Sequence, residues 1–129
     1  MSRKFKSADE WLKQADYDLE SAEIMHKGKR YLYVVFLCHL AVEKALKGIY
    51  AHRFQKDPPR IHNLNYFSDI LKLELSVELK EFLDRLNDLS VPTRYPEEIA
   101  ELEKEYDQTM SKAALKRSKE FLAWAKKQV

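Results

Sequence analysis

A histidine and a glutamate near the middle of the chain are the side chains best suited to chemistry. His39 and Glu43 are four residues apart, so on a helix they share one face. Imidazole and carboxylate can both exchange protons, so this pair could line a polar groove or act as acid and base. A histidine packed at a helix interface and hydrogen-bonded to the carboxylate would explain the spacing equally well. A metal site is not expected, because the other histidines lie in distant segments.

Basic residues follow the same segment and could hold an anion. Lys44 and Lys47 are three residues apart and share a helix face, so they could grip a phosphate or form a solvated helix edge. Arg53, Lys56 and Arg60 cluster near a proline-rich stretch and could extend that patch. Residues 97–107 are rich in acidic side chains. Together with the basic patch, they indicate a surface whose positive and negative charges lie in separate regions.

Two predicted loop segments carry further candidate ligand-binding residues. His62 precedes Asn63, a candidate helix cap, so it could close the loop onto the helices or donate to a nucleotide at a helix start. Arg94 has a planar guanidinium suited to phosphate or carboxylate, and Tyr95 could stack on a base or pack inward. An alternative role for Arg94 is a buried ion pair with Glu43 that locks the loop.

The elements that would position these residues are helical. Ser7 and Glu10 have the spacing of a capping box, and apolar residues recur at helical spacing from there to a stop at Gly28. A second helix is predicted from about Arg30 to about Phe54. It carries two apolar stripes, as expected for a helix contacted on two sides, either centrally in a bundle or at a dimer interface.

The second half of the chain predicts shorter helices. Pro58 and Pro59 break the pattern, and Asn63 and Ser76 can cap the next two helices. Residues 90–96 predict a proline-bounded loop, followed by a short helix and a last helix that ends in lysines. The predicted fold is all-α: an up-down antiparallel helical bundle of four main helices plus short extra helices, forming one domain over residues 1–129.

Several large side chains should fill the core of this bundle. The aromatic residues expected there are Trp11, Phe36, Phe82 and Phe121. Cys38, on the inner stripe of the second helix, should be a small buried hydrophobic residue rather than a nucleophile.

Composition narrows the class of protein. The 129 residues are 45% hydrophobic and 34% charged, which excludes a disordered chain, and only two are glycine, which argues against glycine-rich phosphate loops. The single cysteine rules out an internal disulfide and fits a cytoplasmic protein. No secretory signal and no membrane span are expected. The net charge of +2 does not by itself predict nucleic-acid binding.

An ordered set of motifs resembles the HEPN family. Residues 36–47 read FLCHLAVEKALK, which is similar to the signature helix of that family. Trp11 and Ala15 lie in the preceding helix as they do there, and residues 59–64 resemble its Pro-x-x-His-x-Leu step. Residues 94–96 resemble the Arg-Tyr-Pro of one branch.

This resemblance implies a nucleotide- or RNA-associated binding module that forms a homodimer. It also implies a nucleotidyltransferase partner encoded as a separate chain, as in a toxin–antitoxin pair. A nucleotide is the implied ligand, and no cofactor is implied. The candidate ligand-binding residues are His39, Glu43, Lys44, Lys47, Arg60, His62, Arg94 and Tyr95.

One departure bears on catalysis. Nuclease members carry an arginine followed, four to six residues later, by a histidine in a late helix, but this chain has no histidine after His62. Leu40 also replaces the usual glutamine of the signature helix. The sequence therefore assigns no catalytic residue. A divergent RNase and a purely structural interaction domain remain alternatives.

Overall fold

This computed structural model describes residues 4–129, which contain four long helices and two short ones joined by loops. Their bounds are Ala8–Lys27 (α1), Tyr31–Phe54 (α2), Leu64–Ile70 (α3), Val77–Arg94 (α4), Ile99–Glu105 (α5) and Gln108–Lys126 (α6). No strand occurs in this part, so the all-α prediction is confirmed. The basic segment 1–6, expected not to be a secretory signal, lies partly outside the described residues.

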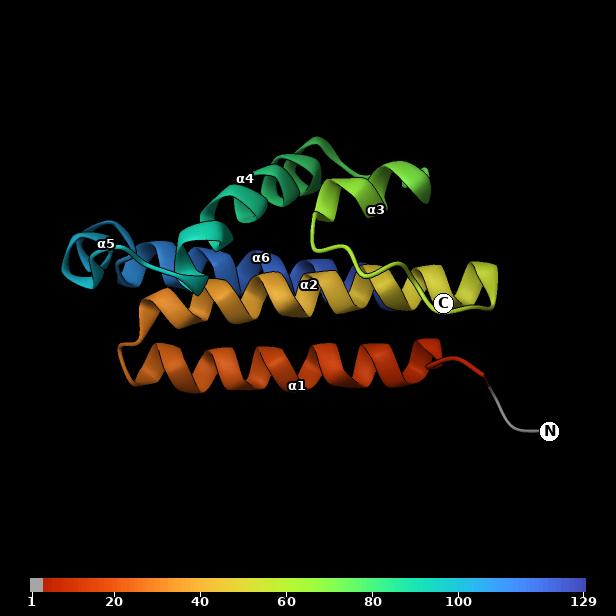
Figure 1. Cartoon of the computed structure of the whole chain (residues 1–129), viewed down its shortest axis with the longest axis horizontal. Helices are drawn as coiled ribbons and strands as arrows, with labels where there is room; N and C mark the ends of the chain where they lie inside the picture. Colours follow the sequence, from red (N-terminus) through yellow and green to blue (C-terminus); the bar gives the residue numbers. More distant parts are fainter. Residues whose placement is uncertain (1–3) are drawn as a thin grey trace.

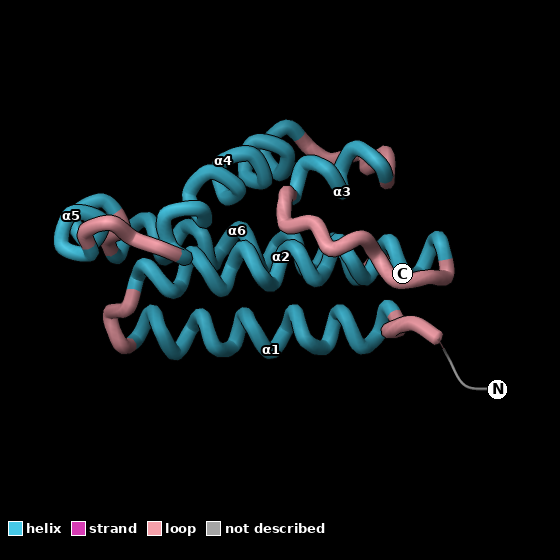
Figure 2. The backbone as a smooth tube through the Cα atoms, viewed as in Figure 1, coloured by secondary structure: helices cyan, strands magenta, loops and turns pink. Residues whose placement is uncertain are grey.

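The long helices alternate in direction along the chain, as an up-down bundle requires (Figure 1). α2 is the central element, because α1, α3, α4 and α6 all contact it. α3 and the inclined α4 lie on one side of α2, and α1 lies on the other (Figure 2). The short α5 projects at the end of the molecule where α1 turns into α2.

Short polar side chains start most of the helices. The Ser7 hydroxyl accepts a hydrogen bond from the Glu10 amide at 3.1 Å, as the capping box predicts. The Glu10 carboxylate does not complete the box but accepts from Gln14. The same kind of cap opens α3, α4 and α6, from Asn63, Ser76 and Asp107 respectively.

The first helix ends at the predicted position, but the residue with the left-handed conformation is not the predicted glycine. Gly28 caps α1 with an ordinary negative φ, and it is Lys29 that takes the left-handed conformation, at a φ of 62°. The amides of Lys29 and Arg30 donate back to the last turn of α1. This tight turn fixes the position of the residues that open α2.

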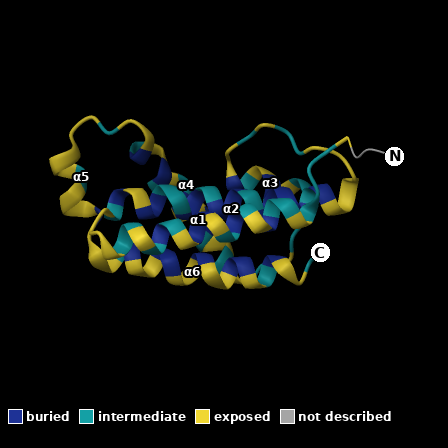
Figure 3. Ribbon diagram, turned by 90° about the horizontal axis from the view of Figure 1, so that it is seen from below, coloured by how far each residue is buried: buried dark blue, intermediate teal, exposed yellow. Residues whose placement is uncertain are grey.

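The two apolar stripes of α2 are both covered within the chain. Val34, Cys38 and Ala45 are fully buried, and Leu46 on the other stripe is also fully buried. The short helix α5, by contrast, is almost entirely exposed (Figure 3). Close approach of α1 is possible at Gly48, where an added Cβ would lie 3.3 Å from the Cβ of Trp11. The two stripes therefore reflect a central helix, and Leu46 is not available to a partner.

The predicted loop over residues 90–96 is wrong, because α4 continues through Pro92 to Arg94. A proline in the last turn removes only one backbone hydrogen bond. Two side chains reinforce that turn: the Ser90 hydroxyl donates to Asn87 O, and the Thr93 hydroxyl donates to Ser90 O. The short helix expected after Pro96 is present as α5, which has no fully buried residue.

The predicted aromatic core is only partly confirmed. Phe121 is fully buried, and Phe82 is half-buried but packs against the core. Trp11 and Phe36 are also only half-buried. Cys38 is buried as predicted, and burial raises the pKa of its thiol to about 11. No helix in residues 4–129 is both long and apolar enough to cross a membrane.

Candidate functional site

A groove of about 350 Å³ lies between α2, the start of α3 and the last turns of α4. Its lining comes from three separate segments of the chain. The lining residues are His39, His62, Asn63, Asn87, Asp88, Ser90, Val91 and Arg94. Three residues predicted from the sequence as ligand-binding, His39, His62 and Arg94, are therefore brought together.

The Glu43 carboxylate organises the buried side of this site. It is 3% exposed and accepts a hydrogen bond from Lys47 Nζ at 2.8 Å. Its two oxygens also lie 3.1 and 3.2 Å from Nδ1 of His62. The His62 side chain is 66% exposed, so it links the buried pair to the groove surface.

His39 is held by an asparagine whose orientation is fixed by its other hydrogen bonds. The Asn87 Oδ1 accepts from the Leu64 amide at 3.0 Å, and its Nδ2 donates to Asn63 Oδ1 at 2.9 Å. The same Oδ1 lies 3.4 Å from Nε2 of His39. Because that oxygen can only accept, the proton of the neutral imidazole sits on Nε2.

This tautomer leaves Nδ1 of His39 without a proton. The atom is buried, has no hydrogen-bond partner among the described residues, and lies 3.9 Å from Glu43 Oε1. The hydrogen bond to Glu43 considered from the sequence is therefore not formed. Burial lowers the pKa of His39 and outweighs the opposing effect of Glu43. His39 is a neutral base held behind the groove.

This pKa shift predicts a pH dependence of stability. The unfolded chain takes up a proton at His39 near pH 6.5, and the folded chain does so only at lower pH, so stability is lost as pH falls below about 6.5. His39→Gln, which cannot take up that proton, should lose less stability than the wild type between pH 7.5 and 5. Urea unfolding at both pH values measures this, and an equal loss in the two proteins would contradict it.

Arg94 stands at the outer rim of the groove. Its guanidinium carbon lies 5.1 Å from the centroid of the half-buried Phe36 ring. Arg94 is exposed and does not pair with Glu43, so the buried ion pair considered from the sequence is not formed. Because the side chain is exposed, the guanidinium N–H groups are open to an anion.

The remaining candidates lie outside the groove. Lys44 pairs with Asp18 of α1 at 2.9 Å, and Lys47 is buried against Glu43, so neither forms a solvated edge. Arg60 is exposed and does not line the groove. Tyr95 is 88% exposed and borders a different cavity.

Sequence reasoning missed four residues that line the groove, namely Asn87, Asp88, Ser90 and Val91, and Asn87 is the one that holds the site together. It lies four residues after Leu83 and three before Ser90, both of which are buried, so it occupies the inner face of α4. A polar residue on a predicted apolar stripe was the available signal. No group of three or more potential metal-ligating side chains is brought together within residues 4–129.

The comparisons with known proteins agree with this fold. The crystal structure of TT1696 from Thermus thermophilus is similar with a TM-score of 0.81 and 24% identity, over 95% of this chain and 98% of that one. ST0689, an archaeal HEPN homologue, is similar with a TM-score of 0.77 and 26% identity, over 96% and 98%. No curated protein matches the sequence. The HEPN domain family model matches residues 8–128, and the chain therefore belongs to the HEPN family of nucleotide-binding and RNase-type modules.

Proposed function

We propose that this protein binds a phosphate group of a nucleotide or of RNA in the groove between α2 and α4. The observation that carries the proposal is the convergence of Arg94, His62 and His39 from three segments onto one groove. The exposed guanidinium of Arg94 is a donor suited to phosphate oxygens. His62 donates to the Glu43 carboxylate through Nδ1, which leaves Nε2 of the neutral ring to accept from a ribose hydroxyl.

The surrounding groups favour one phosphate together with its sugar. Asp88 lines the same groove and is exposed. A carboxylate there accepts from a ribose hydroxyl but repels a second phosphate. Glu43 does not oppose the anion strongly, because Lys47 neutralises it.

Arg94→Ala tests this site. Hydrogen bonds to charged groups contribute about 1.5–3 kcal/mol, so affinity for a short RNA or a nucleoside monophosphate should fall roughly 10- to 100-fold. Stability should change little because Arg94 is exposed. Fluorescence anisotropy and calorimetry measure the affinity. Arg85→Ala, at an exposed arginine of the same helix that does not line the groove, is the matched control. Equal affinities in the two variants would remove the groove as the binding site.

RNA cleavage is the second candidate function, because two histidines and an arginine line the same groove. His62 is exposed enough to reach a substrate, and His39 is a neutral base behind it. Gel analysis of the RNA from the binding experiment separates the two functions. Cleavage that disappears in both His39→Ala and His62→Ala favours the enzyme, and intact RNA favours binding alone.

We also propose that the chain acts as a homodimer beside a separate nucleotidyltransferase chain, in a toxin–antitoxin-like system. Family membership supports this proposal, and so does the exposed apolar surface next to the groove, where Val91 is 69% and Tyr95 88% exposed. Light scattering should give twice the chain mass of 15.3 kDa. A mass of one chain at all concentrations would contradict the dimer.

A further inference from the structure

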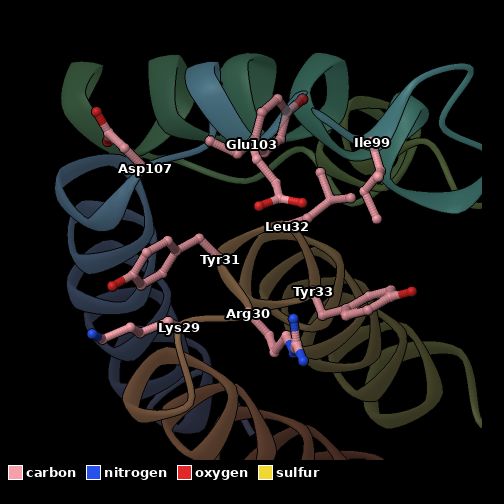
Figure 4. Close-up of a pocket in the computed structure, with 9 residues that line it drawn as sticks. Lys29, Arg30, Tyr31, Leu32, Tyr33, Ile99, Glu103 and Asp107 are labelled. Carbon is pink, nitrogen blue, oxygen red and sulfur yellow. The ribbon is translucent and has the colours of Figure 1, made fainter. Parts of the chain in front are cut away.

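A second cavity, of about 540 Å³, lies at the end of the molecule where α1 turns into α2. It shares no lining residue with the groove. The turn and the first residues of α2 form one side, and α5 and the start of α6 form the other (Figure 4). Its volume lies within the range of small-molecule sites, which is about 300–1,000 Å³.

Tyrosines give this cavity flat apolar walls. Tyr106 is 3% exposed and its hydroxyl donates to Leu89 O at 2.6 Å, so its ring is held in place. Tyr31 packs against the ring of His26 at 5.5 Å between centroids. Tyr33 is 46% exposed and borders the opening. Such walls favour a flat ring, which can stack on or pack edge-on to tyrosine.

Charges of opposite sign lie on opposite walls of the cavity. Lys29 and Arg30 extend from the turn, and Glu103 extends from α5 on the facing wall (Figure 4). These three side chains and that of Asp107, a second carboxylate in the lining, are exposed, and none of the four forms an ion pair within residues 4–129. The first turn of α2 has no acidic residue and no side-chain cap, so the partial positive charge of its amides adds to the basic wall.

We infer that this cavity binds a small molecule that has a flat aromatic ring, an anionic group at one end and an N–H or O–H donor at the other. The anion would lie against Lys29, Arg30 and the start of α2. The ring would lie against Tyr33, which extends on the side of Ile99 and away from Tyr31 (Figure 4), and the donor would bond to the Glu103 carboxylate. A nucleoside monophosphate and a free aromatic amino acid both have this chemistry.

Titration of the whole chain with each class of probe tests the inference. AMP and GMP represent the nucleotides, and tryptophan and tyrosine represent the amino acids, with amide NMR and calorimetry as the readouts. Saturable binding of at least one class is expected, with the shifted amides at residues 29–33 and 99–107. Tyr33→Ala and Glu103→Gln should each raise the Kd about tenfold or more, since each removes one of the contacts that define the site.

Matched variants separate this cavity from the groove. Tyr17→Ala, at a 69% exposed tyrosine of α1, and Glu105→Gln, at an exposed glutamate of α5 outside the cavity lining, should bind like the wild type. Absence of saturable binding by all four probes would overturn the inference. Binding that survives both Tyr33→Ala and Glu103→Gln but is lost in Arg94→Ala would overturn it as well, while supporting the groove.

Discussion

Glu43→Ala is expected to lower the free energy of unfolding by about 3–5 kcal/mol, the usual cost of leaving one partner of a buried ion pair alone. The Lys47 ammonium would lose its carboxylate in a site where its side chain is only 9% exposed. The rings of Trp11 and Phe67, each 5.8 Å from Nζ, would compensate only partly. This loss is a large share of the roughly 5–15 kcal/mol that stabilises a typical domain. Urea unfolding measures it.

Two further variants identify the cause of that loss. Glu43→Leu combined with Lys47→Met replaces the pair by apolar side chains and should recover most of the stability. Glu101→Ala removes a glutamate from an exposed pair with Lys104, whose side chains are 66% and 77% exposed, and should have little effect. If the double variant is as unstable as Glu43→Ala, packing around Glu43 matters more than the charge of Lys47.

Helix positions followed from the sequence because the local signals and the tertiary packing agree. The caps at Ser7, Asn63 and Ser76 and the stop at Gly28 are all set by residues within one turn of the helix end. The end of α4 could not be found in this way. Pro92 is a local stop signal, and it is tolerated because Ser90 and Thr93 bond to the last turn and because both are buried against the bundle.

The site was predictable only in part. The spacing of His39 and Glu43 places both on one helix face, and in the structure they lie 3.9 Å apart. The sequence grouped Lys47 with Lys44, whereas Lys47 pairs with Glu43. Which groups face them depends on how α3 and α4 cross α2, and no local pattern encodes that crossing. An ion pair between Arg94 and Glu43 was therefore compatible with the sequence. In the structure His62 contacts Glu43 instead, and Arg94 lies over the ring of Phe36.

Asn87→Ala is expected to lower the free energy of unfolding by about 2–4 kcal/mol. The side chain makes three hydrogen bonds, to His39, Asn63 and the Leu64 amide, and each contributes about 1 kcal/mol. Because these bonds join α2, the cap of α3 and α4, the change should loosen the groove as well as the fold. Urea unfolding measures the loss, with Asn65→Ala as the matched control, since no side-chain hydrogen bond of Asn65 occurs within residues 4–129.

Asn87→Asp separates the acceptor role of this side chain from its donor role. The carboxylate can still accept from the Leu64 amide and from His39, but it cannot donate to Asn63 Oδ1, whose orientation is set by the amides of Asn65 and Tyr66. The new negative charge beside Nε2 should raise the pKa of His39 above its value in the wild type. An NMR titration of the imidazole measures that change. An unshifted pKa in a folded Asn87→Asp variant would show that Asn87 does not hold His39, and the groove would then lack the fixed tautomer on which its chemistry depends.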